Sequence, residues 1–288
     1  MSDTPPGKPT RVLVPRHSAA TRITHWINVL AVSFLLMSGL QIFNAHPALY
    51  WGAKSVFAHP WLAMEAIERA GRPMGVTTIF GHAFDTTGLF GLSGKAGVQV
   101  PRGFPAWATV PSWRDLASGR RWHFFFAWLF VINGLVYLAL SFLQRHIQRD
   151  LWPKGWQLRP AHLWHEVVTH AQLKFPKGEA ARSYNVLQKG AYLAVIFILL
   201  PLMLATGLTM SPGFDTAAPW LLDLFGGRQS ARSIHFITAS LLVAFVVVHL
   251  VMVVASGTWN NIRSMITGRY AIRPDAPTPV ADAAGEAA

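Results

Sequence analysis

The sequence predicts an all-α integral membrane protein in which four transmembrane helices form a bundle. Apolar residues make up 52% of the 288 residues and charged residues only 13%, which is about half of the charged share in soluble domains. The apolar residues gather in four stretches, each long enough for the roughly 20 residues that a helix needs to cross a bilayer. We predict spans at residues 23–43, 122–143, 189–208 and 232–257, all within a membrane domain of residues 23–257.

Polar segments flank this membrane domain. Residues 1–22 contain neither the apolar core nor the small-residue cleavage site of a secretory signal. Residues 258–288 begin with an amphipathic stretch and end in a tail rich in proline and alanine, which we expect to be disordered. Pro201 lies inside the third span and predicts a kink there, because proline removes a helical hydrogen bond.

A long connection of residues 44–121 separates the first two spans. Its prolines and charged side chains exclude a further span, and its aromatic content favours an ordered cap. Within it, Trp61 to Ala70 suggests a short interfacial helix, and the glycine-rich stretch from Gly75 to Gly97 suggests a folded loop. Exposed apolar patches tend to mark interaction sites, so we predict that this cap docks a partner. A lid that only shields the bundle is the alternative.

The distribution of lysine and arginine sets the expected orientation. Residues 1–22, 144–189 and 258–288 carry four, eight and three basic residues, whereas the short connection before the fourth span carries only Arg228, with Arg232 at its edge. Short segments rich in basic residues stay in the cytoplasm. We therefore predict that both termini and the second connection are cytoplasmic and that the long first connection lies outside.

Cysteine and charge narrow the chemistry. The chain has no cysteine, which excludes cysteine-ligated iron–sulfur clusters, covalently attached haem and disulfides. The net charge is +12. In a membrane protein, basic residues more often set topology and meet anionic headgroups. We therefore expect the basic residues to contact the lipid bilayer, and we expect no nucleic acid as a partner.

Two histidines, His235 and His249, interrupt the fourth apolar stretch fourteen positions apart. In a helix this spacing separates them by roughly 21 Å along the axis and by about 40° around it, so they share a face, one near each membrane surface. His25 and His123 begin the first two spans. The predicted topology therefore pairs His25 with His249 near the cytoplasmic surface and His123 with His235 near the outer surface.

Paired imidazoles across a helix bundle suit a six-coordinate haem iron, because imidazole is a good ligand for iron. The four histidines thus predict two non-covalent b-type haems that carry electrons across the bilayer. For any single histidine, a packing role at the end of a span is a respectable alternative. Four together favour ligation, since ionisable groups inside a membrane are costly and tend to be functional.

Small and basic residues near these histidines fit the same interpretation. Gly39, Gly134 and Gly207 leave room for a flat ring, although ordinary helix packing explains them equally well. Arg22 and Arg232 lie beside ligand histidines and could pair with haem propionates. They serve equally well as charges that set topology.

At this point the sequence resembles the four-span di-haem cytochrome b subunits of bacterial Ni/Fe-hydrogenases and formate dehydrogenases, within the bacterial cytochrome b561 superfamily. The resemblance covers the spans, about half of the chain. The long first connection departs from those subunits and is closer to relatives that accompany periplasmic molybdopterin oxidoreductases of the sulfite-oxidase-like kind. The resemblance to the cytochrome b subunits rests on the four histidines, THW around His25, SYNVLQK at residues 183–189 and NNIRSMITG after the fourth span.

In the formate dehydrogenase relatives, the segment that matches SYNVLQK lines a quinone site beside the inner haem. The resemblance therefore implies a quinone site at Asn185 and Gln188, with Tyr184 and Lys189 nearby. A cap at the start of the third span is the alternative role of Asn185. The motif HLWHEVVTH, residues 162–170, is interpreted as a solvated surface helix.

The expected function is electron transfer by a bacterial inner-membrane cytochrome. It would carry electrons between the quinone pool, at a site on the cytoplasmic side, and a periplasmic redox partner, which the resemblance suggests is a molybdopterin oxidoreductase. Substrate chemistry would then lie in the partner, and no residue of this chain is assigned a catalytic role. The alternatives are a stand-alone quinol-dependent reductase of an external acceptor and a haem-free transporter or anchor.

Overall fold

The computed structural model describes residues 12–95, 98–172 and 184–272, and the chain divides into two compact units. We call residues 23–145 and 191–248 the core unit, and residues 1–22, 146–190 and 249–288 the terminal unit. The proline- and alanine-rich tail, for which we expect disorder, lies outside the described residues.

Four long helical segments confirm the predicted four-span architecture. Among the described residues, four helices are long and apolar enough to cross a membrane. The third is not continuously α-helical, because a π-helical turn, η5, directly precedes the segment that contains Pro201. The segments are α1 (Ala19–Phe43), α2 (Leu116–Leu143), the run α4 (Val186–Ala194), η5 (Val195–Leu199) and α5 (Leu200–Thr209), and α8 (Arg228–Ala255).

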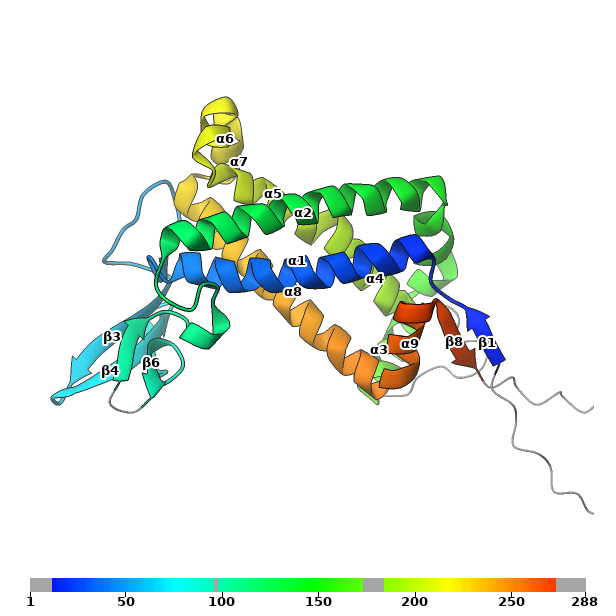
Figure 1. Cartoon of the computed structure of the whole chain (residues 1–288), viewed down its shortest axis with the longest axis horizontal. Coiled ribbons are helices and arrows are strands. Elements are labelled where there is room, and N and C mark those ends of the chain that lie inside the picture. Colours follow the sequence, from blue (N-terminus) through cyan, green and yellow to red (C-terminus); the bar gives the residue numbers. More distant parts are fainter. Residues whose placement is uncertain (1–11, 96–97, 173–183, 273–288) are drawn as a thin grey trace, which may run out of the picture. The chain divides into compact units, whose positions relative to one another are not determined.

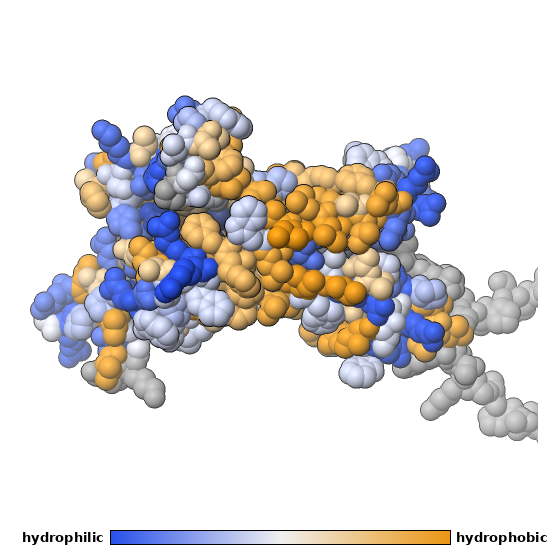
Figure 2. Space-filling view, turned by 45° about the horizontal axis from the view of Figure 1, so that its top comes forward, coloured by the Kyte–Doolittle hydropathy of each residue, from blue (hydrophilic) through white to orange (hydrophobic). Residues whose placement is uncertain are grey.

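The surfaces of these helices are strongly apolar. Trp128, Ile132 and Leu135 of α2 are all exposed, and Figure 2 shows apolar side chains covering the long helices. In water such a surface would be unfavourable, but in a bilayer it is the face that lipid covers. α1 and α2 lie side by side (Figure 1), and Phe34 stacks on Phe126 with ring centroids 4.3 Å apart.

The first connection folds as a β-structured cap, which corrects the expectation of a helix at Trp61 to Ala70. This stretch forms strand β3, because it pairs in antiparallel register with β4 across a turn at Ala70 and Gly71. Both turn residues have positive φ, as two-residue hairpin turns require. The cap has a sheet in the order β2 (Ala48–Leu49), β3 (Leu62–Arg69), β4 (Arg72–Ile79), β5 (His82–Asp85), and a ribbon of β6 (Gly91–Lys95) and β7 (Val98–Arg102).

The described part of the glycine-rich stretch, residues 75–95, contains the end of β4 and the strands β5 and β6. Gly91 has φ +76°, and a Cβ there would lie 2.3 Å from the carbonyl oxygen of Glu65. A Cβ on Gly75 would lie 2.4 Å from the carbonyl oxygen of Phe90. Glycine at both positions therefore lets the β6–β7 ribbon pack directly on the main sheet.

The cap is fixed to the ends of α1 and α8 by an apolar core. Phe43 at the end of α1 is buried with Leu49, Leu62 and Met64 of the cap, and Phe236 of α8 packs on this cluster. The short elements η1 (Ala106–Ala108), α6 (Pro212–Ala217) and α7 (Pro219–Leu224) complete the core unit.

A buried arginine ties the cap to α1. Arg102 donates hydrogen bonds from Nη2 to Gln41 Oε1 at 3.3 Å and to Thr109 Oγ1 at 3.0 Å, and it also bonds two cap carbonyls. Burial lowers the pKa of the Arg102 guanidinium, and the nearby charge of Arg114 lowers it further. With its donors paired, this cation can remain buried, which makes the cap a fixed part of the core unit.

The terminal unit joins the two ends of the chain through a sheet that the sequence did not predict. β1 (Val12–Pro15) pairs antiparallel with β8 (Arg269–Ile272), and Arg16 lies over the ring of Tyr270 at 4.2 Å. The amphipathic stretch after the fourth span is helix α9 (Thr258–Thr267). The second connection forms η2 (Ile147–Leu151), η3 (Gly155–Leu158) and α3 (Pro160–Ala171).

Candidate functional site

The core unit brings His123 of α2 and His235 of α8 together. Their ring centroids lie 6.4 Å apart, with an angle of 62° between the ring planes. Both rings lie near the cap end of their helices, since each residue follows the N-terminus of its helix by seven positions. This is the pair that the sequence predicts for the outer haem.

Ser38 of α1 fixes the tautomer of His123. The Ser38 hydroxyl donates its hydrogen to the carbonyl oxygen of Phe34 at 2.6 Å, and its oxygen lies 3.1 Å from His123 Nδ1. A hydroxyl has a single hydrogen, so Ser38 accepts a hydrogen from Nδ1. The lone pair of the imidazole therefore remains on Nε2.

Thr206 of α5 repeats this arrangement at His235. Its hydroxyl donates to the carbonyl oxygen of Leu202 at 2.6 Å and lies 3.0 Å from His235 Nδ1. His235 Nδ1 is thus a donor as well, and its lone pair is also on Nε2. Histidines that ligate a metal almost always donate their other ring N–H to a neighbour, which fixes the ring orientation.

The glycine after each hydroxyl residue lets the helices approach the rings. A Cβ on Gly39 would lie 3.4 Å from His123 Cε1, and a Cβ on Gly207 would lie 3.4 Å from His235 Cε1. In the structure both glycines therefore face the imidazoles. A Cβ on Gly134 would meet no atom within 4 Å, so the flat-ring role remains a prediction for Gly134.

The His123–His235 pair fits a haem iron. An imidazole–metal bond is about 2.0–2.1 Å long, so two rings that share one metal have centroids about 6 Å apart once the ring radii are added. The observed separation is 6.4 Å. Both rings also carry the Nε2 lone pair that ligation requires. The donor set and its spacing thus suit a bis-histidine haem iron.

Arg232, one candidate for pairing with a propionate, is engaged with the cap. Its Nη1 donates to the carbonyl oxygen of Ala48 at 2.8 Å and its Nη2 to that of His46. The neighbouring Ser233 donates to the Tyr50 carbonyl at 2.6 Å and accepts from Trp61 Nε1 at 2.9 Å. These bonds hold the start of α8, and so His235, against the cap.

The histidines predicted for the inner haem lie in different units, and their pairing remains a prediction. His25 lies in α1 within the core unit, whereas His249 lies near the end of α8 within the terminal unit. Arg22, the other candidate for a propionate, belongs to the terminal unit and donates from Nη1 to the carbonyl oxygen of Ile266. It thereby ties the start of α1 to the end of α9.

Asn185 and Gln188 form a reciprocal cap at the start of α4. Asn185 Oδ1 accepts from the backbone N–H of Gln188 at 2.9 Å, and Gln188 Oε1 accepts from the backbone N–H of Asn185 at 3.4 Å. The capping alternative considered for Asn185 is thus a real contact. Its amide nitrogen also lies 2.6 Å from Nε2 of His170 on α3, a contact that sequence analysis missed.

Lys189, one turn into α4, is a buried cation. Its side chain is 6% exposed, and its Nζ lies 3.5 Å from Oε1 of Gln157, which also accepts from the backbone N–H of Lys154 at 2.9 Å. The start of the third span therefore combines amide, imidazole and ammonium groups. The amide and ammonium groups can donate to the carbonyl oxygens of a quinone, and an imidazole nitrogen that has a lone pair can accept from a quinol hydroxyl.

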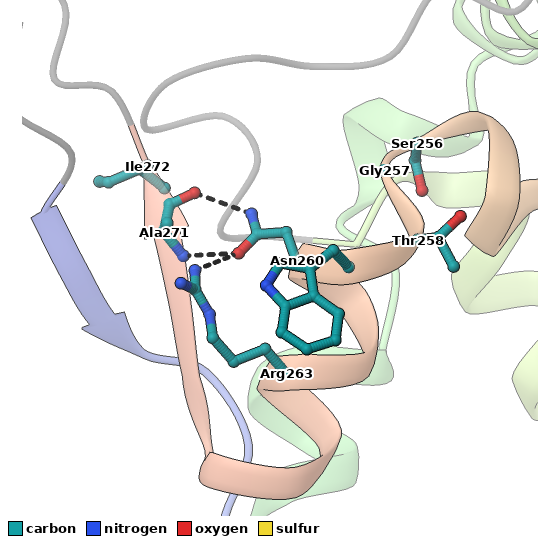
Figure 3. A pocket seen from close by; sticks show the side chains of 8 residues that line it. Ser256, Gly257, Thr258, Asn260, Arg263, Ala271 and Ile272 are labelled. Carbon is teal, nitrogen blue, oxygen red and sulfur yellow. Dashed lines mark hydrogen bonds between the residues drawn. The ribbon is translucent and has the colours of Figure 1, made fainter.

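A hollow of about 510 Å³ lies beside α9, and three hydrogen bonds join Asn260, Arg263 and Ala271 at its wall (Figure 3). Asn260 Oδ1 accepts from the backbone N–H of Ala271 at 2.9 Å and from Arg263 Nη2 at 2.6 Å, and Asn260 Nδ2 donates to the Ala271 carbonyl at 2.9 Å. Asn260 thus closes α9 onto the edge of β8. This gives the NNIRSMITG stretch a structural role.

The cap exposes large aromatic side chains. Phe57 is 75% exposed and Phe80 is 71% exposed. Phe80 lies at the turn between β4 and β5 with φ +48°, a backbone conformation that is unfavourable for a bulky side chain. Its ring stacks on Trp61 with centroids 5.6 Å apart, and Trp61 stacks in turn on Trp51 at 6.0 Å.

Comparison with known proteins places these observations in a family. The model of the family described as "Prokaryotic cytochrome b561" matches residues 76–268, which include the last three spans. A curated protein of Azospira oryzae, named "Putative protein-methionine-sulfoxide reductase subunit YedZ1", is 28% identical over 240 residues. The alignment covers 82% of this chain and 89% of that relative. No solved structure matches the chain.

Proposed function

Because the chain belongs to the prokaryotic cytochrome b561 family, and hence is a multi-pass membrane protein that binds haem b, we propose that it carries electrons between the quinone pool and a periplasmic redox partner. The observation that carries this proposal is the His123–His235 pair. Its rings share one tautomer and stand at the separation that a shared iron requires. A bis-histidine haem leaves no open iron position, so it transfers electrons and does not activate oxygen.

Two haems per chain are proposed. His123 and His235 hold the outer haem beneath the cap, and His25 and His249 hold the inner one. The fourteen-residue spacing of His235 and His249 supports this arrangement, because within the continuous helix α8 it amounts to roughly 21 Å of axial distance. When bound, the haems supply one-electron redox centres at two depths of the bilayer.

A haem count tests this arrangement. A pyridine haemochrome assay on the purified protein should give two haem b per chain. His123→Ala or His235→Ala should remove the outer haem only, and His25→Ala or His249→Ala the inner one only. His82→Ala is the matched control, since His82 is exposed on β5 of the cap, and it should retain both haems.

Two results of this assay would contradict the proposal. If wild-type protein contains no haem, the redox interpretation fails. If each of the four substitutions removes both haems equally while His82→Ala removes none, the histidines are required for haem binding but their division into two pairs is unproven.

We place the quinone site on the cytoplasmic side, at Asn185 and Gln188. The support is the resemblance of this segment to quinone-binding relatives, together with the polar groups that meet at the start of α4. The orientation rests on the basic residues of the second connection and the termini. Both termini are then cytoplasmic, and the cap faces the periplasm.

The proposed partner is a periplasmic molybdopterin oxidoreductase that docks on the cap. The name of the Azospira relative identifies it as a subunit of a methionine-sulfoxide reductase, and we extend that role to this chain. Electrons would then flow from quinol through the haems to a partner that reduces oxidised methionine. The exposed aromatic side chains of the cap support docking.

The alternatives predict different results. A stand-alone quinol-dependent reductase would reduce an external acceptor at full rate without any partner. A haem-free transporter or anchor is disfavoured by membership in a cytochrome family.

A further inference from the structure

We propose that His170 is the group that exchanges protons with the quinone, and that Asn185 is its positioning residue. The inference rests on the proposed quinone site and deepens it. It starts from a contact between α3 and the start of α4, where Asn185 Nδ2 lies 2.6 Å from His170 Nε2. Both residues belong to the terminal unit.

The hydrogen bonds around Asn185 fix the orientation of its amide. The backbone N–H of Gln188 donates to the oxygen Oδ1 at 2.9 Å, so the other amide atom, Nδ2, faces His170. An amide nitrogen is only a donor. His170 Nε2 is therefore the acceptor in this contact and carries the lone pair of a neutral imidazole.

The other ring nitrogen of His170 agrees with this tautomer. Nδ1 lies 2.9 Å from the backbone carbonyl oxygen of Glu166, which accepts hydrogen bonds and cannot donate them. The proton of the neutral ring is therefore on Nδ1. The ring is held at both nitrogens, with a basic nitrogen presented toward the start of α4.

A carboxylate and a lysine lie near this ring. The carboxylate of Glu166 lies 3.8 Å from His170 Nδ1 and 3.9 Å from Nε2 of His162, one turn away. An opposite charge at this distance stabilises an imidazolium. From α4, the neutral Asn185 faces the ring, and Lys189 is the cation one turn further along, with Gln157 of η3 as its contact.

The position of His170 also gives the proton an exit. The side chains of His170, Glu166 and His162 are 16%, 20% and 25% exposed. The ring therefore touches the start of the third span on one side and solvent on the other. A group that passes protons between a buried substrate and water needs both contacts.

The proton step can be written with its balance. A quinol hydroxyl replaces the Asn185 amide as donor to His170 Nε2, its O–H bond breaks, and an N–H bond forms on Nε2. The electron released with that proton would go to a bound haem, and the imidazolium then loses its Nε2 proton to water. Two such steps convert one quinol to quinone, with two electrons transferred and two protons released.

His170→Gln tests the proposal in full-length protein loaded with haem. We expect quinol-driven haem reduction to slow by about 100-fold, the scale of general acid–base contributions, while dithionite still reduces the haems to the wild-type spectrum. Added imidazole should partly restore the rate. His165→Gln is the matched control, because His165 is exposed on the same helix, and its rate should stay at the wild-type value.

A second variant tests the same contact if His170→Gln loses haem. The carboxylate of Glu166 lies 3.8 Å from His170 Nδ1, so Glu166→Gln should slow quinol-driven haem reduction while dithionite still gives the wild-type spectrum. A wild-type rate in Glu166→Gln together with a wild-type rate in His170→Gln would overturn the proposal.

A readout that does not depend on activity tests the tautomer itself. Nitrogen-15 spectra of histidine-labelled protein should show His170 with its proton on Nδ1 at high pH. Asn185→Ala should change the His170 ring signals and leave those of His165 in place. A proton on Nε2 in wild type would overturn the proposal.

The outcomes separate this inference from the function on which it rests. If Asn185→Ala slows quinol-driven reduction but His170→Gln does not, the quinone site stands and the role of His170 is wrong. If quinol does not reduce the wild-type haems at all, or if only substitutions in the cap abolish the reduction, the proposed function itself is wrong.

Discussion

His123 and His235 in the core unit and His170 in the terminal unit share one tautomer but differ in what their Nε2 atoms meet. All three donate from Nδ1, the first two to the hydroxyls of Ser38 and Thr206 and the third to a backbone carbonyl. The Nε2 atoms of His123 and His235 carry lone pairs on rings 6.4 Å apart. The Nε2 atom of His170 instead accepts from an amide.

This difference separates two uses of one side chain. Two lone pairs at that separation suit a metal ion, which needs ligands without competing protons. A lone pair occupied by an exchangeable donor suits proton transfer, because a substrate hydroxyl can take the donor's place. The hydrogen bond from Nδ1 sets the tautomer, and the group that Nε2 meets then distinguishes the two roles.

The largest expected effect tests the metal-binding side of the comparison. Ser38→Ala and Thr206→Val remove the acceptors that hold His123 and His235, and loss of such supporting bonds typically costs about 10- to 100-fold in metal affinity. We expect the outer haem to transfer to apomyoglobin faster by a factor in that range. The inner haem should remain bound, and the quinol-driven rate at that haem should not change.

Ser33→Ala is the matched control for these variants. Ser33 lies on the same helix as Ser38, and its hydroxyl donates to the backbone carbonyl of Val29 within that helix at 2.7 Å. If Ser33→Ala releases haem as fast as Ser38→Ala, the effect comes from the helix and the hydroxyls have no special role. Unchanged haem retention in the Ser38 and Thr206 variants would mean that the two hydroxyls do not position the ligands.

Sequence patterns were sufficient for the four spans and for the approach of His123 to His235, because both follow local rules, whereas the pairing of His25 with His249 stays a prediction. Apolar length gives the helices, and the period of a helix places His235 and His249 on one face. The hydroxyl partners had a weak signal in MSGL and ATGL, where a polar residue precedes the glycine. Only the glycines can be singled out from the sequence, because a hydroxyl residue beside a glycine is no evidence of a hydrogen bond to another helix.

The cap and the Asn185–His170 contact depend on pairings between distant residues. β3 contains a run that suits a helix, and only its register with β4 makes it a strand. His170 and Asn185 are separated by fifteen positions, with residues 173–183 outside the described part of the chain. No local sequence pattern connects His170 with Asn185, so the sequence predicts only a solvated surface helix for HLWHEVVTH.

The second prediction sharpens the comparison at the cap, which bonds Arg232 three residues before His235. Phe80→Asn should weaken docking of the periplasmic partner by roughly fivefold to tenfold, as truncation of an exposed anchor does. Asparagine tolerates positive φ, so relief of backbone strain should offset the lost stacking on Trp61. Thermal stability should therefore stay near that of wild type, while titration calorimetry shows the weaker binding.

Trp164→Asn is the control for docking. Trp164 is about as exposed as Phe80 but lies on α3 of the terminal unit, which we place on the cytoplasmic side. Point substitution is sharper than deletion of Gly75 to Gly97, because that segment contributes strands to both sheets of the cap. Wild-type affinity in Phe80→Asn, or an equal loss in Trp164→Asn, would remove the cap from the docking proposal.

The smallest expected effect concerns a third kind of histidine, His46 of the cap, whose Nε2 is buried without a hydrogen-bond partner among the described residues. Its ring stacks on Tyr50 with centroids 5.6 Å apart. Burial lowers the pKa of His46 below its ordinary value of 6.5, the charge of Arg232 lowers it further, and Glu65 partly opposes them. Among the described residues, Nε2 of His46 has no hydrogen-bond donor of the kind that Asn185 gives to His170, and no second histidine is paired with it as His235 is with His123. This ring therefore suits neither metal binding nor proton exchange.

The lowered pKa fixes the sign of the pH effect. The folded cap disfavours protonated His46, whereas the unfolded chain protonates it normally. Its contribution to stability is therefore fully present above pH 6.5 and declines as the pH falls below that value toward the folded pKa. As the pH is lowered from 7.5 to 5.5, the thermal unfolding midpoint of wild type should fall, and His46 should account for at most about 2 °C of that fall.

His46→Phe should reduce that fall, and His59→Phe, at an exposed cap position, should keep it. An identical fall in wild type and His46→Phe would show that His46 titrates normally, and the ring would then belong with the solvated histidines.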